Sequence, residues 1–166
     1  MKTLVAFYSR TGTTKKVGQD IAKALKCDKE AIVDTVNRMG PIGYIRSGRD
    51  SMKRNLTKLK KTKKDPAKYG LVIVGTPIWA WNVSTPVRTY LTENRGKFKK
   101  IAFFCTQGGS GSERAFKEMQ DIAKKKPLRT LVLTTKQVVE GNYAEQIKKF
   151  TAKLKTSRTK KKKSRA

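Results

Sequence analysis

The sequence predicts a single α/β domain in which a parallel β-sheet is covered by helices on both faces. Short apolar runs alternate with amphipathic helical segments along most of the 166 residues. The runs are apolar at every position, which is typical of strands buried on both faces of a parallel sheet. The length suits one domain with a real hydrophobic core.

The first unit combines a strand, a polar turn and a helix. Residues 4–8 are all apolar, and residues 9–14 contain four hydroxyl side chains and a glycine. Val17, Ile21 and Leu25 then recur at helical spacing. A weaker strand is expected around residues 31–34.

The second unit repeats this order further along the chain. Residues 71–74 form an apolar strand that ends at the turn 75–77. The next helix has Pro86 in its first turn, and either Ser84 or Thr85 is expected to cap it.

The third unit has a glycine-rich turn. The strand 101–106 leads through the turn 107–111 into a helix, and Ser110 and Glu113 have the spacing of a capping box. The apolar face of this helix comprises Phe116, Met119 and Ile122.

A last strand at residues 130–134 and a last helix close the pattern. The apolar face of that helix comprises Tyr143, Ile147, Phe150 and Leu154. Beyond Leu154 the chain is almost entirely lysine, arginine, serine and threonine, a composition typical of disorder. The chain is therefore predicted to divide into a domain of residues 1–155 and a disordered basic tail of residues 156–166.

Residues 40–68 do not fit the alternation. After the break at Gly40-Pro41, four apolar residues follow at helical spacing, Ile45, Met52, Leu56 and Leu59. Ten basic and two acidic residues lie between positions 44 and 68. This segment is expected to form a basic amphipathic helix followed by a lysine-rich loop.

The composition excludes several classes of protein. Without histidine, the chain has no Ser-His or Cys-His catalytic pair and no histidine-ligated metal, so no metal site is predicted. Cys27 and Cys105 are far apart, which argues against a thioredoxin motif or a zinc ribbon, and Cys105 suits a small buried hydrophobe as well as a reactive thiol. No stretch resembles a cleaved leader or approaches the roughly 20 apolar residues of a membrane span, so a cytoplasmic protein is expected.

Charge is the most unusual feature of the composition. Forty lysines and arginines against 12 acidic residues give a formal net charge of +28. More than half of this excess lies in residues 44–68 and 151–166. Such segments suit contact with nucleic acid or an anionic membrane surface, and they suit a solvated surface without a specific partner equally well.

Three turns fall at the carboxyl ends of predicted strands, the edge where open parallel sheets bind ligands. Residues 9–14 suit a phosphate at a helix N-terminus, although the same hydroxyls also suit plain helix capping. Residues 75–82 hold both tryptophans, which would sandwich a planar ligand or plug the end of the core. The glycines of residues 105–111 would let the backbone approach a ligand's polar edge.

Together these turns resemble the flavodoxin family. Residues 9–14 match the S/T-x-T-G-x-T form of that family's phosphate loop, and residues 75–82 and 106–111 are similar to its two ring-binding loops. Residues 43–50 and 75–79 resemble small prokaryotic flavodoxin-like proteins, a group that includes electron carriers and quinone reductases. The chain differs from many flavodoxins in being strongly basic and in having no tyrosine in the third loop.

The resemblance implies a doubly wound three-layer sandwich with a five-stranded parallel sheet in the order 2-1-3-4-5, and non-covalent binding of FMN. The first turn would hold the phosphate, Trp79 or Trp81 would lie against the isoalloxazine ring, and the backbones of the second and third turns would meet its polar edge. The implied cofactor-binding residues are Ser9, Arg10, Thr11, Gly12, Thr13, Thr14, Thr76, Pro77, Ile78, Trp79, Trp81, Asn82, Thr106, Gln107, Gly108 and Gly109.

Three functions follow as alternatives. The first is an electron carrier that exchanges electrons with redox partner proteins through FMN, with no side chain acting as acid or base. The second is an FMN-dependent NAD(P)H:quinone oxidoreductase on the same fold. The third, of another class, is a basic module that docks on nucleic acid or an anionic membrane. The sequence leaves the oligomeric state open.

Overall fold

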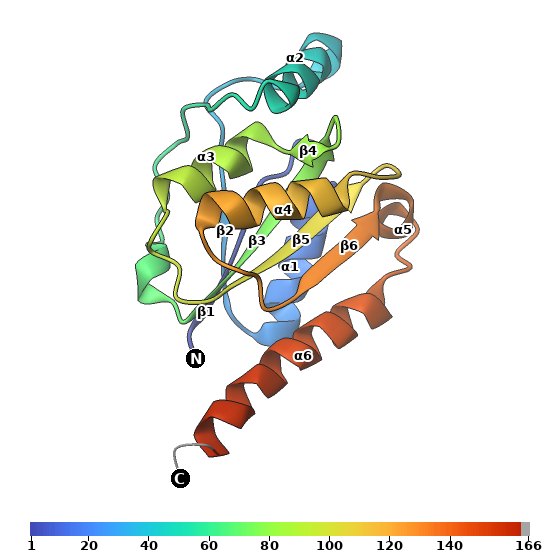
Figure 1. The fold of residues 1–166 in the computed structure, drawn as a ribbon. Coiled ribbons are helices and arrows are strands. Elements are labelled where there is room, and N and C mark those ends of the chain that lie inside the picture. The colour runs from blue at the N-terminus through green and yellow to red at the C-terminus, as the bar shows by residue number, and fades with distance from the viewer. Residues whose placement is uncertain (164–166) are drawn as a thin grey trace.

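A central sheet with helices on both faces forms the body of the molecule in the computed structural model, which describes residues 1–163 and the side chains of residues 1–155 (Figure 1). The strands are β1 (Thr3–Phe7), β2 (Asp28–Ala31), β3 (Leu71–Trp79), β4 (Asn82–Val83), β5 (Ile101–Gln107) and β6 (Thr130–Thr134). The helices are α1 (Thr13–Leu25), α2 (Gly40–Met52), a short 3-10 helix (Pro66–Lys68), α3 (Thr85–Glu93), α4 (Ser112–Ala123), α5 (Thr135–Val139) and α6 (Ala144–Lys163).

The sheet has the predicted order. Five parallel strands run β2-β1-β3-β5-β6, with β5 and β6 in the places of the predicted fourth and fifth strands. The short β4 is an addition that pairs antiparallel with the end of β3. The second strand lies earlier in the chain than predicted. It ends at Ala31, where the chain leaves the sheet, and Asp34 pairs with Leu59 in an isolated bridge.

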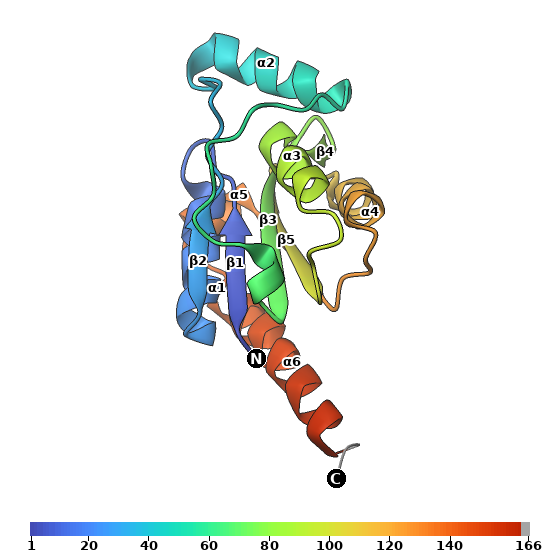
Figure 2. The ribbon, with the colours of Figure 1, turned by 90° about the vertical axis from the view of Figure 1, so that its left-hand side faces the viewer.

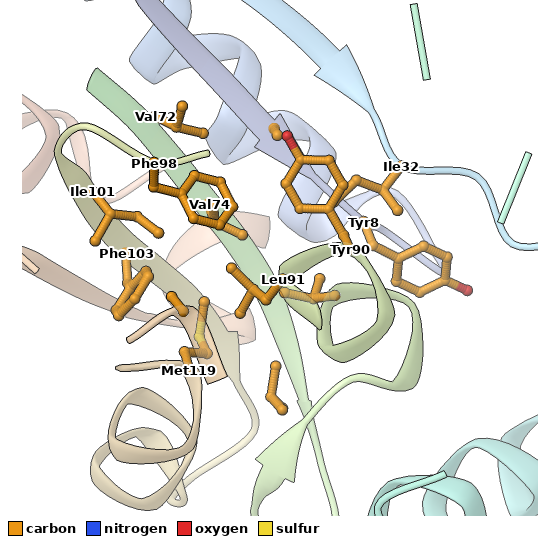
Figure 3. Packing of buried hydrophobic residues seen from close by; sticks show 14 of the residues in the cluster. Tyr8, Ile32, Val72, Val74, Tyr90, Leu91, Phe98, Ile101, Phe103 and Met119 are labelled. Carbon is orange, nitrogen blue, oxygen red and sulfur yellow. The ribbon is translucent and has the colours of Figure 1, made fainter. Parts of the chain in front are cut away.

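The apolar strands divide their side chains between two cores, one on each face of the sheet. On β3, Val72 and Val74 pack toward α3 and α4, where they meet Tyr90 and Met119 (Figure 3). Their neighbours Leu71 and Ile73 pack on the other face with residues of α1, α5 and α6. Figure 2 shows the resulting three layers edge-on. Burial on both faces explains why the strands are apolar at every position.

The predicted helix starts are right at α3 and wrong at α4. Ser84 has the N-cap position of α3, as one of the two alternatives had it, but its side chain makes no capping hydrogen bond and instead accepts one from Thr76. The capping box at Ser110 does not form, because the N-cap of α4 is Gly111 and the Ser110 hydroxyl accepts a hydrogen bond from Trp81 instead. The Gln107 side chain accepts a hydrogen bond from the first N–H of α4.

Helix α2 forms where a basic helix was expected, but the predicted apolar face is not the face that packs. Its buried residues are Gly43, Ser47 and Ser51, whereas Ile45 and Met52 are 70% and 59% exposed. A Cβ atom on Gly43 would lie 2.2 Å from the backbone carbon of Arg38. The small residues therefore pack so closely that large side chains are left outside.

Helix α6 runs past the predicted domain boundary. It ends at Lys163, while residues 164–166 and the side chains from 156 onward lie outside the described part of the chain. The disordered tail therefore stays a prediction. No helix within the described residues is long and apolar enough to cross a bilayer.

Candidate functional site

A cavity of about 800 Å³ lies at the carboxyl ends of the strands, between the sheet and α2. Both views of the fold place α2 beyond this edge of the sheet (Figures 1 and 2). Most of the predicted cofactor-binding residues line the cavity: Ser9, Arg10, Thr11, Thr13, Thr14, Pro77, Ile78, Trp79, Trp81, Thr106, Gln107 and Gly108. The three turns therefore meet at one site.

The first turn leaves the N-terminus of α1 without a side-chain cap. Its N-cap, Gly12, has a φ of 102°, and a Cβ atom there would meet nothing within 4 Å, so conformation and not space favours glycine. Ser9 accepts a hydrogen bond from the Gly12 N–H, at 3.0 Å. Within the described residues, the hydroxyls of Thr11 and Thr13 make no hydrogen bond. These hydroxyls and the first amides of α1 are free to bind an anion.

Thr14 differs from the other hydroxyl residues of this turn. Its side chain is buried and forms a hydrogen bond of 2.8 Å with the hydroxyl of Thr106 at the end of β5. This bond joins the first turn to the third. Thr14 therefore fixes the relative position of two walls as well as lining the cavity.

The two tryptophans occupy different environments in the hairpin between β3 and β4. The two-residue turn consists of Ala80 and Trp81, with φ angles of 47° and 60°. Left-handed backbone is unfavourable for residues other than glycine, so this turn is strained. Trp79 is half-buried, whereas Trp81 is 60% exposed at the rim, where its indole N–H donates to Ser110.

Trp79 is held on two sides by side chains that the sequence analysis did not single out. The Tyr8 ring meets it edge-on, with ring centroids 5.4 Å apart, and the Arg38 guanidinium lies 5.4 Å from the ring centroid. Burial, with a further contribution from Asp34, raises the pKa of Tyr8 to about 12. Tyr8 is therefore neutral at physiological pH.

Arg38 is the centre of a buried ion-pair network. Its side chain is 2% exposed and donates to Asp34 at 2.5 Å and to Asp50 of α2 at 3.0 Å. Burial opposes its charge, but the two carboxylates outweigh this and raise the pKa of Arg38. Burial by itself would raise the pKa of Asp50. The hydrogen bonds from Arg38 and Asn55 outweigh this effect and hold that pKa below its usual value. The network therefore links α2, through Asp50, to the guanidinium that contacts the Trp79 ring.

The third turn packs directly on the tryptophan hairpin. A Cβ atom on Gly111 would lie 2.7 Å from the Trp81 Cα atom, and its φ of 109° also favours glycine. Gly111 allows the third turn to pack against the tryptophan hairpin, and it is also the N-cap of α4. Gly108, in contrast, lines the cavity. The glycine-rich composition therefore has more than one cause.

Four of the predicted site residues are not in the cavity lining: Gly12, Thr76, Asn82 and Gly109. Thr76 and Asn82 are buried, and the Thr76 hydroxyl bonds with Ser84 at the start of α3. Asn82 donates to the Ala80 carbonyl and has a buried side-chain oxygen with no partner in the described chain. Cofactor contact by these four residues stays a prediction.

Helix α2 supplies a wall that the sequence analysis missed as part of the site. Its contribution to the lining is Tyr44, Ile45, Ser47, Gly48, Arg49 and Met52, and Ala80 and Thr135 also line the cavity. The Arg10 guanidinium lies 5.4 Å from the centroid of the Tyr44 ring, which brings the first turn against α2. The similarity of residues 43–50 to flavodoxin-like proteins was the available signal.

Polar contacts hold the end of α2 against the body of the molecule. The Ser51 hydroxyl donates to the Val83 carbonyl at 2.7 Å. Arg88 of α3 donates to the carbonyls of Ser51 and Asn55, and pairs with Glu118 of α4 at 2.7 Å. The cavity wall on this side therefore depends on a few directed bonds.

Comparison with known proteins identifies the family. A family model described as flavodoxin matches residues 2–153. This chain belongs to the flavodoxin family. No curated protein matches it.

Solved structures share this flavodoxin fold at low sequence identity. A putative flavoprotein from Bacteroides uniformis is 24% identical, with a TM-score of 0.74 over 89% of this chain and 96% of its own. A flavoprotein from Lactobacillus acidophilus, in complex with FMN, is 23% identical, with a TM-score of 0.67 over 79% of this chain and 92% of its own. A variant of the Pseudomonas aeruginosa flavodoxin is 14% identical, with a TM-score of 0.53 over 93% of this chain and 99% of its own. These likenesses confirm the fold class.

Proposed function

We propose that this flavodoxin-family protein binds FMN in the cavity at the strand ends and transfers electrons. The observation that carries the proposal is the meeting of two features in one cavity. An uncapped, hydroxyl-bearing helix N-terminus lies in the same cavity as the half-buried ring of Trp79. The first feature suits a phosphate and the second suits a flat aromatic ring.

Each wall of the cavity would hold a different part of the cofactor. The amides at the start of α1 and the hydroxyls of Ser9, Thr11 and Thr13 would bind the phosphate. Trp79 or Trp81 would lie against the ring, and the backbones of the second and third turns would contact its polar edge. Bound FMN would supply the redox chemistry by accepting and returning electrons. The FMN in the Lactobacillus acidophilus flavoprotein supports the choice of cofactor.

The protein's own part is to position the cofactor and to set its surroundings. Tyr8 and Arg38 limit the movement of Trp79, because they contact its ring from two directions. Tyr8, with its pKa of about 12, gives up no proton near neutral pH. No side chain is required as acid or base in this proposal.

Binding of FMN to phosphate-loop variants tests the proposal. The double variant Thr11→Ala/Thr13→Ala removes two hydroxyl donors to a charged phosphate and should weaken FMN binding by about 100-fold, at roughly tenfold per hydrogen bond. The dissociation constant is measured from the quenching of FMN fluorescence on titration with the refolded apoprotein. Thr130→Ala, an exposed hydroxyl residue at the amino end of β6, is the control and should leave binding unchanged. A wild-type protein that takes up no FMN would overturn the proposal.

An FMN-dependent NAD(P)H:quinone oxidoreductase is the second candidate. Arg10 and Arg49 line the same cavity as the apolar side chains of Ile45 and Met52. The guanidinium groups suit the phosphates of a dinucleotide, and the apolar side chains suit a quinone ring. Steady-state oxidation of NAD(P)H by the FMN-loaded protein with a quinone separates the two functions. A carrier should show almost no turnover without a partner reductase.

The partners and location stay predictions. A carrier would exchange electrons with redox partner proteins, and a reductase would act on NAD(P)H and a quinone. The cytoplasm is the predicted compartment.

A further inference from the structure

We propose that α2 docks this protein on an anionic lipid bilayer, with the outer face of the helix in the headgroup region. The docking does not depend on bound FMN. It rests on three observations: large apolar side chains that the described chain leaves uncovered, basic side chains among them, and the outermost position of the helix.

The exposed apolar side chains are concentrated on and beside α2. Of the large apolar side chains that are more than half exposed, five lie on α2 or next to its start: Met39, Ile42, Tyr44, Ile45 and Met52. Ile42 is the most exposed of these five, at 76%. Exposed apolar side chains gathered on one element in this way usually mark a contact with another molecule or a membrane.

The packing of α2 makes this exposure a fixed feature of the fold. Gly43, Ser47 and Ser51 occupy the buried face, and the close approach of Gly43 to the Arg38 backbone leaves no room for a side chain there. Rotation of the helix to bury Ile42 and Ile45 would break the Ser51–Val83 and Asp50–Arg38 bonds. The apolar residues therefore stay outside.

Charge on the outer face is of one sign. Helical spacing puts Arg46, Arg49 and Lys53 on the same side as Ile42 and Ile45, and all three basic residues are exposed. The only acidic residue of α2, Asp50, is turned inward to Arg38. A helix with apolar and basic residues on one outer face is typical of helices that lie in a membrane interface.

The position of α2 suits a flat surface. Figures 1 and 2 both show the helix lying across the end of the molecule, beyond the layers of the sandwich, with the C-terminal end of α6 at the opposite end. Thirteen residues give an exposed face about 20 Å long. The net charge of +28 would also steer the protein toward an anionic surface.

A bilayer explains both properties of this face, whereas a nucleic acid explains only one. Phosphate groups on a nucleic acid would bind the basic side chains but would leave Ile42 and Ile45 without an apolar partner. Anionic headgroups next to acyl chains provide a partner for each. Ile45, Arg49 and Met52 also line the cavity, so docking would bring the mouth of the cavity to the membrane.

Vesicle binding by the full-length protein tests the proposal. Co-sedimentation is measured with vesicles of phosphatidylcholine alone and with vesicles that contain phosphatidylglycerol, and binding is expected only to the latter. Arg46→Gln/Lys53→Gln should weaken binding by about 30-fold, at roughly fivefold per charge. Ile42→Gln should weaken it by about tenfold, and Ile42→Trp should strengthen it.

Matched variants at other sites are the controls. Lys99→Gln/Lys126→Gln removes two exposed lysines at the other end of the sheet, and Val139→Trp adds an indole at an exposed position on α5. Both should bind vesicles like the wild type. Circular dichroism and FMN titration of every variant separate lost docking from lost folding and from failure of the proposed cofactor site.

Three outcomes would overturn bilayer docking. The first is no binding of the wild type to anionic vesicles. The second is binding that the Ile42 variants leave unchanged while the charge variant weakens it, which would indicate a polyanion such as nucleic acid. The third is binding that is lost only on deletion of residues 156–166, which would assign the contact to the tail.

Discussion

The two halves of the cavity wall are built on different principles. The strand-end half is continuous with the core, because its turns follow directly from strands β1, β3 and β5, which are buried except at the ends of β3 and β5. The α2 half packs through Gly43, Ser47 and Ser51 and is tied by ion pairs and hydrogen bonds. Apolar burial stabilises the first half, and directed polar contacts stabilise the second.

This difference implies that the halves should respond separately to mutation. Damage to the strand-end half should lower the stability of the whole domain, because strands of the core open only on global unfolding. Damage to the contacts of α2 should open that helix while the sheet stays folded. The cavity would then lose one wall and keep the other.

The largest effect is expected in the strand-end half, from Gly75→Ala. A Cβ atom on Gly75 would lie 2.0 Å from the ring of Phe104, in a strand with neighbours on both sides. We expect a loss of about 3 kcal/mol in the free energy of unfolding, measured by denaturant titration. Gly108→Ala, at the same edge but in open space, should change it by less than about 0.5 kcal/mol. Equal stability of the two variants would contradict the tight packing of this half.

A smaller and more local effect is expected from Arg38→Met in the α2 half. The variant leaves Asp34 buried without its cation and removes the tie to Asp50. Tryptic cleavage after Arg46 or Arg49, followed by mass spectrometry, should accelerate by about 30-fold or more, because cleavage follows the population of the open helix. Global unfolding should change less than in Gly75→Ala.

Arg129→Met is the control for the Arg38 variant. Arg129 is exposed and lies next to β6, away from α2. Its replacement should leave the cleavage rate in α2 unchanged. If Arg38→Met instead unfolded the whole domain as readily as Gly75→Ala does, the two halves would be one cooperative unit.

The same difference explains which parts of the molecule the sequence predicted. Most of the strands followed from apolar runs, because a strand buried on both faces has to be apolar throughout. Their order followed only from the resemblance to the flavodoxin family. The first turn was singled out by its hydroxyls and its glycine, which lie together in the sequence. The strand ends then brought the three turns together without further information.

The packing of the α2 half could not be predicted from such patterns, because apolar residues of the helix are exposed and a charged residue that supports it is buried. Helical spacing of Ile45 and Met52 predicted a packed face, yet close packing of Gly43 on the Arg38 backbone left them exposed. Arg38 is a buried cation whose partners lie four and twelve positions away, on different segments. No local pattern predicts that its guanidinium lies over Trp79.

The smallest predicted effect is the pH dependence with which α2 opens, and it tests whether charge holds this half of the wall. The hydrogen bonds from Arg38 and Asn55 outweigh burial and hold the pKa of Asp50 below the ordinary value of 3.8. A lowered pKa in the folded state stabilises the fold above pH 3.8, and this contribution is lost as the pH falls from 3.8 through the lowered pKa of the folded state. Asp50→Asn lacks the contribution at every pH. The opening of α2 should therefore be about fivefold more frequent in Asp50→Asn than in the wild type at pH 7, and this difference should shrink as the pH falls below 3.8.

Hydrogen exchange of the amides of residues 40–53, corrected for intrinsic rates and followed by mass spectrometry from pH 3 to pH 7, measures this opening. Asp121→Asn, an exposed carboxylate on α4, should leave it unchanged. Amides of β3 and β5 should show no matching change, because the strand-end half does not depend on Asp50. A difference between wild type and Asp50→Asn that was as large at pH 3 as at pH 7 would mean that Asp50 holds α2 by its shape and not by its charge. The ion-pair description of this wall would then be wrong.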